Sequence, residues 1–296
     1  MLVTIGESNT KARSVMPQSA PPNTRQAALW NDTSGKAWVE MQPILDEILA
    51  PFERLVVDAG YPGEGGNVLD IGCGAGATTL AMARRVGNDG NCVGLDISQP
   101  LVALAKKRSR VEEVANASFK VGDAQAYAFE SGHFHAVVSR FGVMFFDDPV
   151  AAFTNIRKAA RRRGKLAFVA WRSPVENDFM TTAARAAAPF LPPAPAPDPD
   201  APGQFAFADA AKVKRILGAS GWASIEVEQA DVLCQIAQRD LMTYATRLGP
   251  VGAALREVDR ATAEKVTKVL PAAFAPFVED GEARFNAACW LVTALA

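Results

Sequence analysis

This chain of 296 residues has few histidines and cysteines, and neither charge is in clear excess. Its two histidines are His133 and His135, and its four cysteines lie far apart with no CxxC pair. This pattern argues against a zinc site and against a disulfide framework, so we expect no metal and a reducing, cytoplasmic environment. Lys plus Arg number 31 and Asp plus Glu 32, which leaves a net charge of −1. A chain this close to neutral is not typical of proteins that bind nucleic acid.

Long apolar runs are also missing. The longest largely apolar stretch, residues 287–296, has about half the ~20 residues that a membrane span needs. The start of the chain has no apolar core followed by a cleavage site, so we expect neither a secretory signal nor membrane insertion. Apolar residues nevertheless make up 49% of the chain, which is enough for a sizeable core and excludes disorder of the chain as a whole.

The chain divides into three regions. Residues 1–25 are polar and contain Pro17, Pro21 and Pro22, which predicts a flexible leader. Residues 26–60 carry apolar side chains at helical spacing and predict a helical segment, in which Trp30 and Trp38 fit either a core or a cover over a ligand. A turn cluster over residues 61–66 then opens the main domain, residues 61–296.

Strands and helices alternate through the first half of this domain. The predicted strands are Asn67–Ile71, Cys92–Asp96, Ser118–Val121, His135–Ser139 and Lys165–Trp171. The last of the helices between them is expected over Pro149–Arg162, with a basic end that suits a helix C-terminus better than a nucleic-acid patch. This alternation predicts an α/β fold with a parallel sheet. Two further strands are expected at Ser224–Val232 and Arg284–Leu295, with helices before and between them.

A glycine-rich turn follows the first predicted strand. Gly72, Gly74 and Gly76 separate that strand from a helix, where glycine allows the backbone to approach a ligand closely. Cys73 lies inside the turn, and we interpret it as a small packing residue rather than a nucleophile. As G-x-G-x-x-A, the same turn also fits a dinucleotide-binding enzyme.

Three carboxylates favour another ligand. Asp70, two residues before Gly72, suits a positively charged amine and would repel a pyrophosphate. Asp96 ends the second strand 20 residues after Gly76, where a carboxylate accepts hydrogen bonds from ribose hydroxyls. Asp123 follows the third strand and can accept from an adenine amine, while the N–H of Ala124 meets a ring nitrogen. Adenine, ribose and a charged amino-acid tail together describe S-adenosylmethionine.

Four segments resemble successive motifs of class I S-adenosylmethionine-dependent methyltransferases, in the branch of the ubiquinone- and menaquinone-type enzymes. They are VLDIGCGAGATT, VGLDIS, VGDAQAY and SRFGVMFFDDP. The resemblance implies a Rossmann-like seven-stranded sheet of order 3-2-1-4-5-7-6, with strand 7 antiparallel, a helical N-terminal cover and C-terminal helical insertions. It implies cofactor contacts at Asp70, Gly72, Gly74, Gly76, Asp96, Ile97, Asp123 and Ala124, and around Ser139 or Arg140.

One position departs from the family pattern. His135 stands where the family often has an acidic residue, at the start of the fourth strand. Ligands bind at the other ends of such strands, so we expect neither His133 nor His135 to act as a catalytic base.

The second half of the domain is expected to form the pocket for a methyl acceptor. Insertions 172–207 and 236–281 carry apolar side chains that predict a small, partly apolar molecule: Phe179, Met180, Phe190, Phe205, Phe207, Met242 and Tyr244. Glu176 and Asp178 follow the fifth strand and are the candidate catalytic residues, as a proton acceptor or by orienting the acceptor. The alternatives are a helix cap for Asp178 and a solvated loop carboxylate for Glu176.

The sequence thus predicts methyl transfer from S-adenosylmethionine to an oxygen, nitrogen or carbon nucleophile of a small molecule. Two alternatives remain open: an NAD-dependent oxidoreductase on the same glycine turn, and a non-catalytic protein that binds S-adenosylmethionine. The sequence does not indicate an oligomeric state.

Overall fold

The computed structural model describes residues 22–193, 198 and 200–296. The predicted leader therefore lies outside the described residues, except for its last four. Of these, Thr24 already begins a helix, so the helical segment starts two residues earlier than expected. Three helices precede the sheet: α1 (Thr24–Asn31), α2 (Thr33–Glu40) and α3 (Gln42–Gly60).

The central sheet has the order β3-β2-β1-β4-β5-β8-β6, with a short β7 paired to β8. Its strands are β1 (Asn67–Ile71), β2 (Asn91–Asp96), β3 (Ala117–Val121), β4 (Phe134–Arg140), β5 (Ala160–Trp171), β6 (Ala223–Ala237), β7 (Val278–Glu279) and β8 (Glu282–Leu295). Strands β1 to β5 pair in parallel, and β8 runs antiparallel to both β5 and β6. The predicted α/β fold and strand order are confirmed, with β8 in the place of the family's seventh strand.

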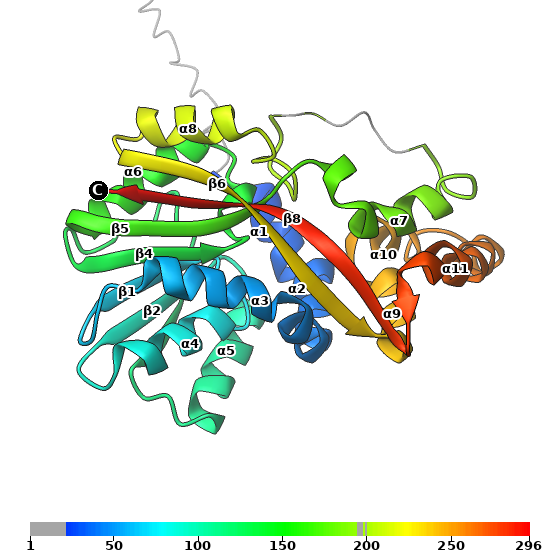
Figure 1. Cartoon of the computed structure of the whole chain (residues 1–296), viewed down its shortest axis with the longest axis horizontal. Helices are drawn as coiled ribbons and strands as arrows, with labels where there is room; N and C mark the ends of the chain where they lie inside the picture. The colour runs from blue at the N-terminus through cyan, green and yellow to red at the C-terminus, as the bar shows by residue number, and fades with distance from the viewer. Residues whose placement is uncertain (1–21, 194–197, 199) are drawn as a thin grey trace, which may run out of the picture.

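Helices cover both faces of the sheet (Figure 1). They are α4 (Ala77–Val86), α5 (Gln99–Val111), α6 (Pro149–Ala159) and α8 (Ala210–Ala219), in addition to α3. Side chains alternate between the faces of a strand. On β5, Ala167 accordingly lies toward Gly60 of α3, whereas the Phe168 ring contacts Phe153 of α6. The central strands β1 and β4 and the second half of β5 are therefore buried between two helical layers, which explains their nearly continuous apolar runs.

A lobe extends from the sheet at the right of Figure 1. There β6 and β8 run on together and meet α7 (Asp178–Ala187), α9 (Gln238–Arg247), α10 (Gly249–Ala254) and α11 (Arg260–Phe274). Phe179 of α7 stacks on Phe285 of β8 with ring centroids 3.7 Å apart, and Phe274 of α11 meets Phe179 edge-on. This aromatic cluster joins the insertions to the long strands.

Three predicted boundaries are wrong by three residues or more. Strand β5 begins at Ala160 rather than Lys165. Helix α6 ends at Ala159 rather than Arg162, because the carbonyl groups of Lys158 and Ala159 accept hydrogen bonds from the backbone of Gly132 and His133. Ala160 is then extended and pairs with Phe134. Strand β6 runs to Ala237, five residues further than expected, because its far end pairs with β8 as far as Glu282. None of the helices in the described ranges is long and apolar enough to span a membrane.

Candidate functional site

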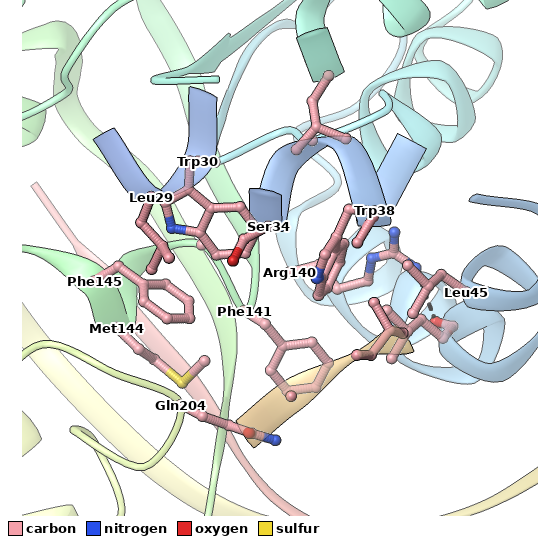
Figure 2. Close-up of a pocket in the computed structure, with 18 of the residues that line it drawn as sticks. Leu29, Trp30, Ser34, Trp38, Leu45, Arg140, Phe141, Met144, Phe145 and Gln204 are labelled. Atoms are coloured by element: carbon pink, nitrogen blue, oxygen red, sulfur yellow. Dashed lines mark hydrogen bonds between the residues drawn. The ribbon is translucent and has the colours of Figure 1, made fainter. Parts of the chain in front are cut away.

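A cavity of about 570 Å³ lies at the carboxyl ends of β1, β2, β3 and β4 and continues into the lobe. Its lining comes from the turns after these strands, from the cover helices α1 to α3, and from α7, α9 and α10. Figure 2 shows residues of the cover, among them Trp30 and Trp38, facing residues that follow β4. Both tryptophans line the cavity, and their rings meet edge-on at 5.6 Å.

The three glycines of the turn have positive φ, each in different surroundings. A Cβ atom on Gly74 would meet nothing within 4 Å, so this residue faces open space. A Cβ on Gly72 would lie 2.6 Å from the backbone of Gly142, and one on Gly76 would lie 2.9 Å from the Phe119 ring. Gly72 and Gly74 line the cavity, whereas Gly76 allows α4 to pack closely on the sheet and is not among the lining residues.

Asp96 is held by backbone donors at the end of β2. The Gly74 N–H donates to its Oδ2 and the Ser98 N–H to its Oδ1, both at 2.8 Å. Burial raises the pKa of Asp96 above its ordinary value, while the N–H donors act in the opposite direction. Asp96 and Ile97 both line the cavity, and the Ile97 carbonyl accepts from Asn31 of α1 at 2.9 Å.

Asp123 binds the N-terminal cover to the sheet. Its Oδ1 accepts from the Asn23 side chain at 2.7 Å, and Asn23 also exchanges two 2.7 Å hydrogen bonds with Asp147. Within the described part of the chain, Asp123 Oδ2 and Gln26 Oε1 are buried without a hydrogen-bond partner. Both residues line the cavity, as does Ala124. Sequence reasoning missed Asn23, because only the fold brings it to a residue 100 positions away.

Asp70 lies beneath the glycine turn rather than on the cavity wall. Its Oδ2 accepts from Thr79 Oγ1 at 2.6 Å, and its Oδ1 is buried with no partner among the described residues. Burial raises the pKa of Asp70 to about 7. The carboxyl group is therefore poised between its neutral and ionised forms near neutral pH.

Of the two candidates at the end of β4, Arg140 lines the cavity and Ser139 does not. The Ser139 side chain is buried and accepts from the Gly142 N–H at 3.1 Å, so it holds the turn that carries the wall. The Arg140 guanidinium donates to the Leu49 carbonyl at 3.1 Å. Burial lowers the pKa of Arg140, and the carboxylates of Asp46, Glu53 and Asp70 counter this shift.

An aromatic wall follows Arg140. Phe141 has a φ of 63°, which is unusual for a bulky residue. Its ring stacks on Trp171 at 4.0 Å, and Phe52 meets both rings edge-on. Figure 2 shows the Phe141 side chain between Arg140 and Gln204 at the cavity. The strained backbone thus holds a rigid aromatic surface where β4 ends.

The predicted catalytic residues Glu176 and Asp178 do not line the cavity. Glu176 forms a capping box with Ser173 and an ion pair with Arg172, and these hydrogen bonds lower its pKa. Asp178 is exposed and pairs with Arg185 at 2.5 Å. It does not cap α7 either, because Asn177 takes that position. Neither carboxylate therefore lies at the cavity, where a proton acceptor or a group that orients the methyl acceptor would have to be.

Three of the seven predicted pocket residues line the cavity: Phe179, Met180 and Tyr244. Phe207 packs instead on Phe153 and Phe168, on the face of β5 that α6 covers. Phe190, Phe205 and Met242 are also absent from the lining. His135 accepts from the Asn67 N–H at 3.1 Å, at the start of β1 and β4 and so at the opposite edge of the sheet. Cys73 lines the cavity, but burial raises its pKa well above the ordinary value, which keeps the thiol protonated.

Residues 68–164 match a protein-family model described as a methyltransferase domain. The chain carries a methyltransferase domain. This match agrees with the predicted resemblance to methyltransferases, and the matched range contains the glycine turn, Asp96, Asp123 and Arg140.

Curated relatives are similar to this chain over less than their full length. The chain is 34% identical to aklanonic acid methyltransferase DauC of Streptomyces sp. over 147 residues, which cover 50% of this chain and 62% of that protein. It is 31% identical to nocamycin O-methyltransferase of Saccharothrix syringae over 120 residues, 40% of this chain and 43% of that protein. The chain thus spans about half the length of these relatives.

Solved structures share the fold around the methyltransferase domain. The YcgJ protein of Bacillus subtilis superposes with a TM-score of 0.56 at 18% identity, over 83% of this chain and 98% of that one. The [4+2]-cyclase SpnF gives a TM-score of 0.55 at 16% identity, over 88% and 94% of the two chains. Because these neighbours include a cyclase, the fold alone does not define the reaction.

Proposed function

We propose that this protein transfers the methyl group of S-adenosylmethionine to an oxygen, nitrogen or carbon nucleophile of a small, partly apolar molecule. One observation carries the proposal. A single cavity joins the polar groups at the ends of β1, β2 and β3 to an aromatic chamber that reaches into the lobe. The match of residues 68–164 to the methyltransferase domain supports the same conclusion.

The polar end of the cavity suits a nucleoside. Each Asp96 oxygen accepts one backbone N–H and keeps a free lone pair, as ribose hydroxyls require. Asp123 Oδ2 is a buried acceptor without a partner in the described chain, and it matches the amine of adenine. Leaving such an atom unpaired costs about 1–3 kcal/mol, so a ligand that donates to it is favoured. Asp70 beneath the turn, in its ionised form, disfavours the pyrophosphate of NAD.

When bound, S-adenosylmethionine supplies a methyl group on a positively charged sulfur. The side chains of this protein hold the acceptor against the aromatic wall of Phe141 and Trp171 and exclude water beneath α1 to α3. The described lining contains no histidine. Burial raises the pKa of Tyr244 to about 12, so its hydroxyl stays protonated at neutral pH. Positioning of the two reactants therefore supplies most of the catalysis.

The lining of the lobe end suits an acceptor with flat rings, because Phe141, Trp171 and Phe179 form an aromatic chamber there. The relatives are named as methyltransferases of small molecules: aklanonic acid, nocamycin and, for the enzyme of Lactococcus lactis at 29% identity, demethylmenaquinone.

Calorimetry with the full chain tests the proposal. We expect S-adenosylmethionine and S-adenosylhomocysteine to bind, and Asp96→Ala to raise both Kd values about tenfold or more, because hydrogen bonds to a charged group are lost. Asp89→Ala, which removes an exposed carboxylate outside the cavity, is the control and should bind both ligands normally.

Two other results would redirect the assignment. If NAD bound and S-adenosylhomocysteine did not, the protein would be an oxidoreductase. If S-adenosylmethionine bound without being converted to S-adenosylhomocysteine by any of a panel of ring-bearing phenols, acids and quinols, a non-catalytic role would be favoured.

A further inference from the structure

The charged side chains that line the cavity are unevenly distributed. The acidic ones are Asp46, Asp96 and Asp123, all at the end formed by the sheet and the cover helices, where Arg140 also lies and Asp46 pairs with Arg108 at 2.8 Å. The lobe contributes Arg247 at the end of α9 and Arg256 after α10. Among the described lining residues of the lobe there is no Asp or Glu. The charged lining of the lobe end is therefore positive, whereas the other end carries charges of both signs.

The two arginines of the lobe are at most weakly paired within the described chain. Arg247 has Glu40 at 3.8 Å, and both side chains are more than 60% exposed, so this pair is weak. Arg256 forms no ion pair there and is exposed. Arg140 differs, because it lies among the carboxylates of Asp46, Glu53 and Asp70. Arg247 and Arg256 are thus the cations available to a ligand at this end.

The space between these arginines and the cofactor end is aromatic. Trp171 and Phe141 form its stacked wall, and Phe179 and Tyr244 line it on the side of the lobe. The Tyr244 hydroxyl makes no hydrogen bond in the described chain and stays protonated, so it can donate to an acceptor oxygen. Flat rings match this surface, and a planar guanidinium matches a carboxylate at the edge of such a ring.

We propose that the methyl acceptor is an aromatic molecule carrying an anionic group such as a carboxylate, and that Arg247 and Arg256 select it through this group. The inference rests on the proposed function, because it assigns the acceptor end of the same cavity. A cationic acceptor is disfavoured there, since it would meet two arginines of which one is weakly paired and the other forms no ion pair in the described chain.

Three probes with one ring system and different charges test this. Calorimetry on the full chain, saturated with S-adenosylhomocysteine, compares 2-naphthoate, its neutral analogue 2-naphthamide and the cationic 2-(aminomethyl)naphthalene. We expect naphthoate to bind roughly fivefold to tenfold more tightly than the amide, and the amine more weakly than either, as two partly exposed ion pairs predict. The preference should shrink in high salt.

The double variant Arg247→Gln, Arg256→Gln should abolish the preference for naphthoate over naphthamide while leaving the affinity for the amide unchanged. Arg260→Gln is the matched control, since this exposed arginine of α11 pairs with Glu264 outside the cavity, and it should keep the full preference.

Equal affinity for naphthoate and naphthamide, an unchanged preference in the double variant, or no binding of any naphthalene would overturn the inference. The first titration, of S-adenosylhomocysteine itself, separates this failure from that of the proposed function. If S-adenosylhomocysteine binds and the probes show no charge preference, only the acceptor assignment is wrong.

Discussion

Asp70→Asn should make this protein more stable above pH 7 and no more stable at pH 5. In the folded chain, burial raises the pKa of Asp70 from 3.8 to about 7, a difference of about three units. Each unit corresponds to about 1.36 kcal/mol, so ionising this buried group costs the folded state about 4 kcal/mol at pH 8. This is an upper value, because it assumes the ordinary pKa in the unfolded chain.

The sign comes from proton binding. Between pH 4 and pH 7 the folded protein holds a proton on Asp70 that the unfolded chain has released. The free energy of unfolding therefore decreases as pH rises through this window and levels off above it. Asparagine cannot ionise, so the variant lacks this decrease.

The amide also has a cost. Its NH₂ group would occupy the position of Asp70 Oδ1, which has no partner in the described chain, and a buried unpaired donor costs about 1–3 kcal/mol. At pH 5 only about 1.6 kcal/mol of the ionisation cost is present, because that pH lies about 1.2 units above the unfolded pKa. The net expectation is therefore a gain of about 1–3 kcal/mol at pH 8 and a change within about 1 kcal/mol of zero at pH 5.

Urea unfolding of both proteins from pH 5 to pH 8 measures this difference. Asp58→Asn, at an exposed carboxylate that pairs with Arg85, serves as the control and should show no such increase in relative stability from pH 5 to pH 8. The same Asp70 variant should bind S-adenosylmethionine more weakly at pH 8, because the cofactor's ammonium group loses a nearby negative charge. A stability difference that stays constant across the pH range would refute the reasoning.

Two further substitutions test the site. Gly76→Ala should lower the free energy of unfolding by about 1–3 kcal/mol, because the new Cβ atom would lie 2.9 Å from the Phe119 ring and the residue has a φ of 87°. Urea unfolding measures this loss. It should be smaller for the control Gly87→Ala, because Gly87 also has a positive φ but its Cβ would meet nothing within 4 Å. Glu176→Gln should leave turnover within about twofold and cost at most about 1 kcal/mol of stability. The side chain closes a capping box and pairs with the buried Arg172, which keeps Asp231 as its other partner. A roughly 100-fold loss of turnover in a stable Glu176 variant would return this residue to the mechanism.

The alternation of strands and helices was visible in the sequence because it is a local property. The first strand and its glycine turn, residues 67–76, occur where they were predicted, since an apolar run followed by closely spaced glycines determines both. Asp96 and Asp123 follow their strands for the same reason, and the carboxyl ends of parallel strands meet at one edge. The order of the strands came from the family resemblance rather than from any pattern within the chain.

Tertiary structure decided which residues share the cavity. Asn23 reaches Asp123 only after the cover helices fold over the sheet, and Tyr244 and Arg247 reach the aromatic wall only because β6 and β8 carry the lobe beyond it. Glu176 is held outside the cavity by a local capping box with Ser173 and by Arg172, which in turn pairs with Asp231 of the distant strand β6. Local spacing in the sequence specifies where a strand ends and a loop begins. The direction of a loop side chain also depends on contacts from distant segments, and those contacts form only in the folded chain.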